Sequence, residues 1–315
     1  MLASIILASC LILPVFFTNN KCEDKYTYTT VLKGIAILLV IIQHFTGGWS
    51  RVFTPLGGIG VSIFLILSGY GINESVKRNG LANFWGKRGV RVCIPYFLVI
   101  TILAFIQFPG MSEYLKDILY IKTSYWYVGY IIKCYLIYWT LSLVFKPQTR
   151  NLIFLIIGII SISLLDNLQG EQALSFITGV ILSDKGIEID KSNKIPAKYL
   201  IIFFWVGILF LMLKQVPTIR EYDSRVLVSA IQLPTRYLIA LFIIFGLAYL
   251  QGFYKNAYLN FVGVISYELY LVHFPLRLYI NNDLLIAITY CVLSILFAYL
   301  FSRFNDMIIK RINNK

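Results

Sequence analysis

The sequence has few of the residues that enzymes most often use for metal binding and catalysis. It contains two histidines, His44 and His273, and 15 acidic residues against 28 Lys and Arg. Its five cysteines are isolated, without a CxxC pair or a histidine close in sequence, so no metal site is predicted. It also lacks a GxxxxGK(S/T) phosphate loop and a GxGxxG turn, which excludes an ATP-driven motor of its own.

Apolar residues dominate instead. They make up 58% of the chain, whose mean hydropathy is +0.76, whereas soluble domains are roughly 45–50% apolar. Apolar windows that approach the roughly 20 residues of a spanning helix recur along the chain, with only short polar breaks. The sequence therefore predicts an all-α polytopic transmembrane helical bundle of about 10–11 spans, in a single domain without a soluble part. The eleven windows are residues 2–18, 31–48, 57–76, 92–108, 125–145, 151–166, 171–183, 198–214, 236–250, 258–280 and 284–302.

The distribution of basic residues predicts the orientation. Nineteen of the 28 Lys and Arg fall in alternate loops and span ends, starting with loop 19–30, and eight fall in the other set. Because Lys and Arg concentrate on the cytoplasmic side, we expect the N-terminus outside and residues 303–315 as a cytoplasmic tail. The net charge of +13 is spread over these inner segments, so no nucleic-acid surface is predicted. Segment 2–18 lacks a preceding basic residue and a following cleavage site, so a retained helix is expected rather than a signal peptide.

The stretch VLKGIAILLVIIQHF, residues 31–45, places Lys33 and His44 at the two ends of an apolar run. Eleven residues return a helix to within about 20° of the same direction, about 16 Å further along its axis, so both side chains share one face. In the predicted orientation Lys33 lies at the cytoplasmic mouth of the span and His44 in its outer half. Ionisable residues at membrane depth tend to mark a functional site. A snorkelling anchor for Lys33 and a helix-end histidine remain open as alternatives.

A cluster of cations follows in NFWGKRGVRVCIPYF, residues 83–97. Arg88 and Arg91 are three residues apart and neighbour each other on one helical face, and Lys87 adds a third positive charge. Guanidinium groups donate paired hydrogen bonds to phosphate oxygens, so the cluster suits a phosphate-bearing ligand. The positive-inside rule alone, or lipid head groups, would also account for it.

Small residues are frequent in GGIGVSIFLILSGYGINES, residues 57–75. Such residues let helices approach closely, which is one interpretation of the segment. The other is that Ser68 and Tyr70, around Gly69, leave backbone space and hydroxyl groups facing a ligand.

Together these stretches resemble the integral-membrane acyltransferase type 3 family of O-acyltransferases. In that family a basic residue, usually Arg, precedes a histidine by eleven positions, and a GxxGVxxFFxxSGF segment, an RxxR element before Pro-Tyr and an ISYxLYLxHxP motif follow. The corresponding residues here are Lys33 and His44, Gly57 through Tyr70, Arg88 and Arg91 before Pro95 and Tyr96, and ISYELYLVHFP at 265–275. Four motifs in the same order make the resemblance specific.

The resemblance implies transfer of an acyl group, commonly acetyl from acetyl-CoA, to a hydroxyl of a cell-surface or exported polysaccharide or its precursor. Residues 31–302 would form the family-like core, and residues 1–30 an additional N-terminal helix and loop. Lys87, Arg88 and Arg91 would hold the phosphates of acyl-CoA, which is a substrate and not a bound cofactor. Lys33 is expected to be a catalytic residue together with His44, with a contact to these phosphates as its other role. His44 would act as general base, and a transient acyl-histidine remains open. Lys33 keeps the charge of the usual Arg but not its planar fork.

Further polar and aromatic residues within spans are candidates for acceptor binding. A stacking and hydrogen-bonding wall is expected from four aromatic residues, Tyr125, Trp126, Tyr127 and Tyr130. Lys133 and Glu268 are expected to face the interior, where one of them helps to position the acceptor sugar, with a mutual salt bridge as the alternative. His273 matches the terminal motif and has either a direct role or a structural hydrogen bond.

The expected partners are an acyl-CoA donor, a glycan acceptor, membrane lipids and polysaccharide-assembly proteins. Many family members carry a further extracytoplasmic hydrolase-like domain, so here the membrane domain or a partner is expected to reach the acceptor. The expected location is a bacterial plasma membrane, with the chain crossing it many times. A transporter of glycans or lipid-linked precursors, without acyl-transfer chemistry, remains the alternative function.

Overall fold

The computed structural model describes residues 1–18, 26–120, 123, 125–192, 194–220, 222, 224–250, 252–277 and 283–313. Over these residues the chain is helical and contains no strand, which confirms the predicted all-α class. Residues 19–25 of the predicted first inner loop, 278–280 of window 258–280 and 314–315 of the predicted tail lie outside the described residues.

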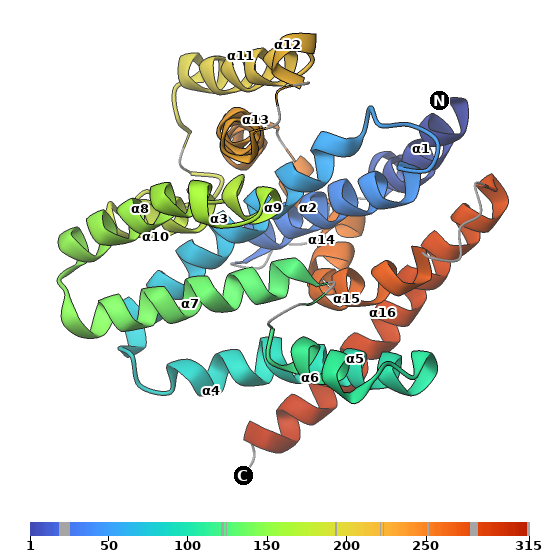
Figure 1. Ribbon diagram of the computed structural model, residues 1–315, viewed down its shortest axis with the longest axis horizontal. Coiled ribbons are helices and arrows are strands. Elements are labelled where there is room, and N and C mark those ends of the chain that lie inside the picture. Colours follow the sequence, from blue (N-terminus) through green and yellow to red (C-terminus); the bar gives the residue numbers. More distant parts are fainter. Residues whose placement is uncertain are drawn as a thin grey trace.

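Two helices, α2 and α3, cross the middle of the bundle (Figure 1). Helices α11 to α13 lie on one side of them, α5 and α6 on the opposite side, and α16 runs diagonally from the right-hand side to the bottom of the view. In chain order the elements are α1 (Leu2–Phe17), α2 (Thr27–Thr46), α3 (Thr54–Asn79), α4 (Phe84–Arg88), the π-helical turn η1 (Gly89–Cys93), α5 (Ile94–Gln107), α6 (Met111–Ile118), α7 (Trp126–Val144), α8 (Pro147–Leu164), α9 (Asn167–Gly170), α10 (Ser175–Asp184), α11 (Ala197–Leu213), α12 (Pro217–Arg220), α13 (Arg225–Gly246), the short turns η2 (Leu247–Tyr249) and η3 (Phe253–Lys255), α14 (Ala257–Val264), α15 (Ser266–Arg277) and α16 (Leu284–Asn313).

Among the described residues, seven helical segments are long and apolar enough to cross a membrane. They are α2, α3, the continuous segment Phe84–Gln107, α7, α8, Arg225–Tyr249 and Leu284–Arg311. Helices α14 and α15 form an eighth span if the 74° bend between them is counted within one crossing. Helices α1 and α11 are apolar but shorter, with 16 and 17 residues. The chain is thus a multi-pass membrane protein, as predicted.

The predicted window 171–183 contains no helix long enough to span the membrane. Its helix α10 has ten residues, which rise about 15 Å, half of the roughly 30 Å hydrocarbon core. The turn before α10 lies beside Ser62 of α3, which donates a hydrogen bond to Gln172 at 2.6 Å, and Asn73 of α3 bonds Asp184 at 2.7 Å. The turn and α10 therefore run parallel to α3 and extend along much of its length.

Glycines allow the central helices to approach each other closely. A side chain at Gly34 of α2 would collide with the backbone carbonyl of Leu259 in α14. Gly263 of α14 faces the carbonyl of Thr30 in the same way, and Gly60 of α3 abuts the backbone of α2. Helices that touch through backbone atoms gain packing contacts that lipid cannot supply, so these positions fix how α2, α3 and α14 are arranged.

Helix ends pair as an alternating topology requires. The Tyr28 hydroxyl at the start of α2 donates to the Ile244 carbonyl near the end of α13 at 2.6 Å. Arg150 at the start of α8 forms an ion pair with Asp184 at the end of α10, with the nitrogen 2.5 Å from the oxygen. These contacts agree with the predicted alternation of helix directions. Which side of the membrane is cytoplasmic stays a prediction.

Two predicted boundaries differ from the structure by eleven residues: the end of α16, at Asn313 instead of residue 302, and the start of α13. Helix α13 begins at Arg225, eleven residues before the predicted window 236–250. Arg236, predicted to be an outer cation at the start of this window, is instead buried within α13 and forms an ion pair with Glu171. Its guanidinium occupies the space left by Gly58 of α3. A charge at this depth is tolerated because a buried counter-charge accompanies it.

Candidate active site

His44 and His273 meet at one end of the bundle. His44 lies two residues before the end of α2, and His273 lies in α15. His44 Nδ1 is 2.7 Å from His273 Nε2, and the two rings lie edge to edge, with their centroids 5.0 Å apart and their planes 14° from parallel. The two histidines of the sequence therefore form one hydrogen-bonded pair.

The hydrogen bonds define which nitrogen carries each proton when both rings are neutral. His273 Nδ1 lies 2.9 Å from the Leu269 carbonyl oxygen, so Nδ1 carries the proton and Nε2 has the lone pair. His44 Nδ1 must then donate to His273 Nε2, which leaves the lone pair of His44 on its own Nε2. The chain of bonds from Leu269 through His273 thus fixes His44 in the form that accepts a proton at Nε2.

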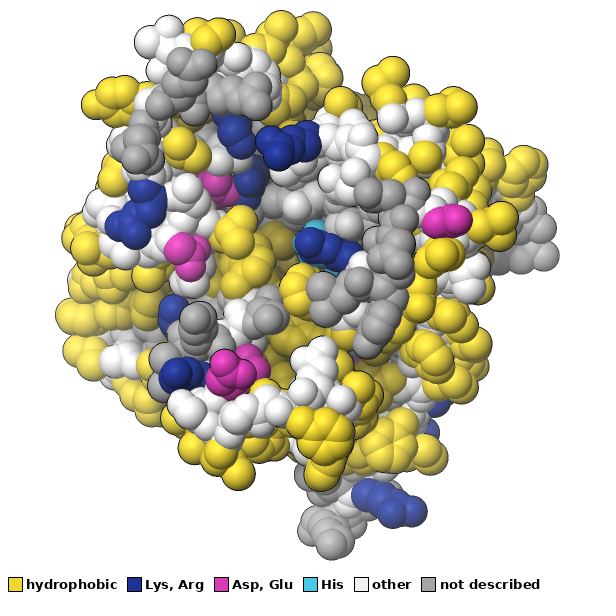
Figure 2. Space-filling view, turned by 45° about the vertical axis from the view of Figure 1, so that its right-hand side comes forward, with side chains coloured by type: hydrophobic (Ala, Val, Ile, Leu, Met, Phe, Trp, Pro, Cys, Tyr) yellow, Lys and Arg dark blue, Asp and Glu magenta, His cyan; other side chains and the backbone are white. Residues whose placement is uncertain are grey.

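Of the two rings, only His44 has accessible surface. His273 is completely buried, whereas His44 is half-buried. Histidine surface is visible in a hollow in Figure 2, beside a basic side chain. Phe274 lies edge-on to the His44 ring with the centroids 6.0 Å apart, and the Arg277 guanidinium lies 5.6 Å from the Phe274 ring and acts electrostatically on His44. A proton acceptor with a nearby positive charge is therefore open to a ligand.

A group of three cations lies near the start of α2, on the helix face that carries His44 near its end. Lys33 is exposed, and the charge that acts on it is that of Arg91. Arg88, half-buried with its guanidinium 5.3 Å from the Phe84 ring, also interacts with Arg91. Within the part of the chain that the structure describes, none of these three cations forms an ion pair. Like charges repel each other here, so an anionic ligand would stabilise the group.

The backbone between α4 and α5 places the two arginines. Residues 89–93 form the π-helical turn η1, which carries Arg91, while Arg88 ends α4 and the predicted third cation, Lys87, is exposed beside it. A π-helical turn inserts an extra residue into a helix and is frequent at functional sites. The predicted three-residue spacing therefore brings the arginines together, although the segment is not a regular α-helix.

Two predicted ligand-facing residues lie apart from the histidine pair. The Ser68 hydroxyl is 2.7 Å from the Tyr135 hydroxyl of α7, and Tyr70 bonds the backbone at Ile189. Both side chains are half-buried. Among the described contacts, none joins Ser68 or Tyr70 to His44, so their predicted role in substrate binding stays a prediction.

Aromatic contacts connect the predicted wall of α7 to the histidine pair. Trp126 packs edge-on against Tyr127 with the centroids 6.4 Å apart, and Tyr127 packs against Tyr270 of α15 at 5.3 Å. Tyr270 in turn lies 5.8 Å from the His273 ring. Tyr127 therefore packs against the helix that carries His273, and the role of Trp126 and Tyr127 in acceptor binding stays a prediction.

Lys133 and Glu268 do not form a salt bridge with each other, so the alternative considered in the sequence analysis was wrong. The Lys133 amine donates to Gln169 Oε1 at 3.2 Å, and Glu268 accepts from the amide of Asn305 in α16 at 3.1 Å. Lys133 is also exposed, contrary to the expected interior position, whereas Glu268 is half-buried. The two groups therefore lie in separate polar contacts.

Sequence reasoning missed several features of the site. The pairing of the histidines, the π-helical turn and the position of Arg277 over Phe274 are absent from the predictions. One signal was present: a chain with only two histidines, each in an apolar span, gives them few other partners at that depth. Their contact would still need the helix arrangement.

Comparison with known proteins yields one match. A family profile described as an acyltransferase domain matches residues 26–303, all but the first 25 and the last 12 residues. No curated protein and no solved structure matches the chain. The match includes both histidines and all three cations of the site. The chain thus belongs to the acyltransferase type 3 family and is a membrane acyltransferase.

Proposed function

We propose that this protein transfers an acyl group, most simply acetyl, from acyl-CoA to a hydroxyl of a cell-surface or exported polysaccharide or its precursor. The observation that carries the proposal is the hydrogen-bonded pair of His44 and His273, with a free lone pair on His44 Nε2. A base in this form, at the open side of the pair, suits abstraction of a hydroxyl proton.

The chemistry of the transfer is simple to balance. The acceptor oxygen attacks the thioester carbonyl carbon while its proton moves to His44 Nε2. A C–O bond forms, the C–S bond breaks, and the proton passes from His44 to the sulfur, so that the products are an ester and free CoA thiol. His273 orients His44 and shares the charge of the imidazolium, as the third member of a catalytic triad does. Arg277 would stabilise the oxyanion of the intermediate.

The cations near the start of α2 have the opposite charge to the phosphates of the acyl-CoA donor. CoA carries several phosphate charges on a long arm that ends in the thioester. Lys33, Arg88 and Arg91 would bind the phosphates, with Lys87 at the entrance. The eleven residues from Lys33 to His44 correspond to about 16 Å along the axis, a distance that the arm would bridge. One helix face would then align both ends of the donor.

The test is mass spectrometry of surface glycans from cells that carry the wild-type protein or His44→Ala. We expect the variant to lose at least about 100-fold in the rate of ester formation, because a general base contributes typically 10²–10⁴-fold. The matched control is Thr140→Val, since Thr140 is exposed on α7 and donates only to the Leu136 carbonyl of its own helix. Equal acyl content in both cell lines, with deletion of the protein changing only the amount of exported glycan, would favour a transporter and sink the proposal.

A further inference from the structure

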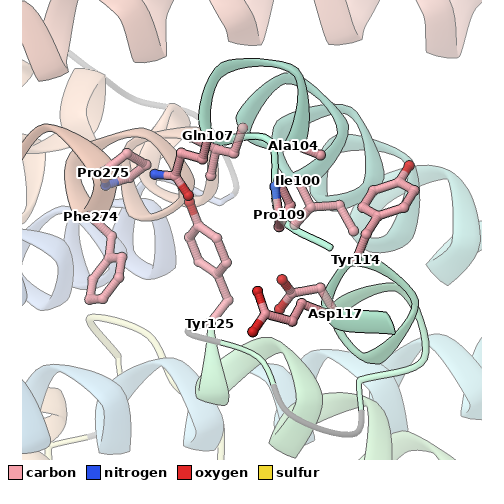
Figure 3. Close-up of a pocket in the computed structure, with 11 residues that line it drawn as sticks. Ile100, Ala104, Gln107, Pro109, Tyr114, Asp117, Tyr125, Phe274 and Pro275 are labelled. Atoms are coloured by element: carbon pink, nitrogen blue, oxygen red, sulfur yellow. The ribbon is translucent and has the colours of Figure 1, made fainter. Parts of the chain in front are cut away.

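A cavity of about 250 Å³ lies next to the histidine pair, between α5, α6 and the end of α15. Figure 3 shows Phe274 and Pro275 on one side of it, Ile100, Ala104 and Tyr114 on the other, and Gln107 and Tyr125 between them. The sequence predictions assigned nothing to α6, and of the residues that line the cavity only Tyr125 was a predicted part of the aromatic wall for the acceptor.

The lining of the cavity is acidic and aromatic. Glu113 and Asp117 of α6 contribute carboxylates, Gln107 an amide, and Tyr114 and Tyr125 aromatic rings. Among the described residues that line the cavity there is no Lys or Arg. Burial raises the pKa of the Asp117 carboxyl above its ordinary value, opposed by a hydrogen bond from Thr123. Ligand hydroxyl groups that donate to this carboxylate would offset the cost of its partial burial.

Acidic and aromatic side chains favour a ligand with hydroxyl groups and without negative charge. Carboxylates and an amide accept hydrogen bonds from hydroxyl groups, and tyrosine rings pack against the apolar faces of sugar rings. The phosphates of CoA would be repelled by Glu113 and Asp117, whereas the cations around Lys33 attract them. The acidic cavity would therefore exclude the anionic donor, and the cations around Lys33 would bind it.

The position of the cavity links it to catalysis. Phe274 lines the cavity and also lies edge-on to the His44 ring, with the centroids 6.0 Å apart. The Tyr125 ring lies 5.7 Å from Phe274, and its hydroxyl donates to the Leu271 carbonyl at 2.8 Å. Helix α15 therefore carries one wall of the cavity and one member of the histidine pair. A chain of sugars that leaves the cavity along Phe274 would reach His44 Nε2.

We infer that this cavity binds one sugar unit of the acceptor, neutral or amine-bearing, next to the unit whose hydroxyl is acylated at His44. The inference rests on the proposed function and adds where the acceptor binds and which charge it carries. The volume supports a single unit, since it is below the roughly 300–1,000 Å³ of pockets that enclose a larger ligand.

The test uses the full-length protein in lipid nanodiscs, acetyl-CoA as donor, and polysaccharide purified from cells that carry His44→Ala as acceptor. We expect the double variant Glu113→Gln/Asp117→Asn to raise the KM for polysaccharide at least about tenfold, because it weakens hydrogen bonds to charged groups. The KM for acetyl-CoA should stay within about twofold of wild type, since its phosphates bind elsewhere. Ala104→Phe, which fills the cavity without altering its charges, should have the same effect.

The control is Lys116→Gln, which changes one charge on α6 at an exposed residue that does not line the cavity. It should leave both KM values unchanged. Binding of the polysaccharide without donor, followed by saturation-transfer NMR, should weaken in Ala104→Phe, and a chitosan tetramer should compete better than an oligogalacturonate tetramer. Unchanged polysaccharide binding in both cavity variants would overturn the inference, and so would stronger competition by the acidic tetramer. Absence of acetyl transfer by the wild type, with binding still lost in Ala104→Phe, would refute the proposed function alone.

Discussion

His44 and His273 are 229 residues apart in the sequence, yet their nitrogens are within hydrogen-bond distance. Each ring has a different task that follows from its surroundings. His273 is completely buried and donates to the Leu269 carbonyl, so it cannot meet a substrate. His44 keeps accessible surface, and the nitrogen with the lone pair is Nε2, which is not the one bonded to His273. At the residue scale, therefore, His44 is the catalytic base of the proposal and His273 a positioning residue.

Substitution of His273 should lower the rate without abolishing it. His273→Ala removes the acceptor for His44 Nδ1, so His44 loses its fixed orientation but keeps its lone pair, and the rate should fall less than in His44→Ala. His273→Gln offers a side-chain oxygen as acceptor and should recover part of kcat. The measurement is kcat and KM for acetyl transfer, where we expect kcat to change and KM for acetyl-CoA to stay constant.

The comparison with His44→Ala separates positioning from catalysis. If His273→Ala were as inactive as His44→Ala and His273→Gln gave no recovery, a purely structural role of His273 would be indicated. Thermal unfolding of each purified variant shows whether the fold is intact.

At the element scale, α2 and the α14–α15 unit build the site together. Helix α2 carries Lys33 and His44 on one face, and α14 packs against it through Gly34 and Gly263. The chain then bends by 74° at Ile265, which turns α15 so that His273 meets the end of α2. Close packing and the bend therefore set the distance between the two histidines.

Gly34→Val should disturb this arrangement. The added side chain would collide with the backbone carbonyl of Leu259, which cannot rotate away as a side chain can. Overpacking of this kind costs about 1–3 kcal/mol, so the apparent Tm in detergent should fall and acetyl transfer with it. The matched control is Gly71→Ala in α3, where an added Cβ meets no atom within 4 Å. Helix propensity then favours alanine by about 1 kcal/mol. Equal Tm values for both variants would contradict the packing argument.

At the scale of the whole molecule, the two proposed sites carry opposite charges. The cations Lys33, Arg88 and Arg91 lie toward one end of α2, and the acidic cavity beside Phe274 lies toward the other. An enzyme that joins a cytoplasmic donor to an exported acceptor needs this separation across the bilayer. The predicted orientation, with loop 108–125 outside and loop 76–92 inside, places each site on the matching side.

Cysteine labelling tests this orientation. In a chain whose five cysteines are replaced, Gly110→Cys should react with a membrane-impermeant maleimide in spheroplasts, and Ala82→Cys only after permeabilisation. Both positions are exposed, and Gly110 has an ordinary φ of −59°, so a side chain there is tolerated. The reverse pattern would place the cationic group outside and contradict the assignment of donor and acceptor ends.

The sequence alone determined the class of the protein and the local geometry of α2. Its apolar windows predicted a multi-pass helical bundle, although seven of the described segments, or eight with the bent pair, are long enough to span the membrane instead of the predicted 10–11. The eleven-residue spacing put Lys33 and His44 on one face, because helix periodicity is a local property. The boundary of α13 was misplaced because Arg236 was taken for a polar end, although a buried carboxylate neutralises it. Local pattern carries no information about such a partner.

Tertiary structure alone decided which residues meet. The histidine pair, the ion pair of Arg236 with Glu171, and the cavity between α5, α6 and α15 each join segments far apart in the chain. Their contacts depend on how helices pack through glycines and bend at Ile265, and packing between helices is set by the shapes of both surfaces at once. Periodicity specifies the face that a residue occupies, whereas only the assembled bundle specifies what that face touches.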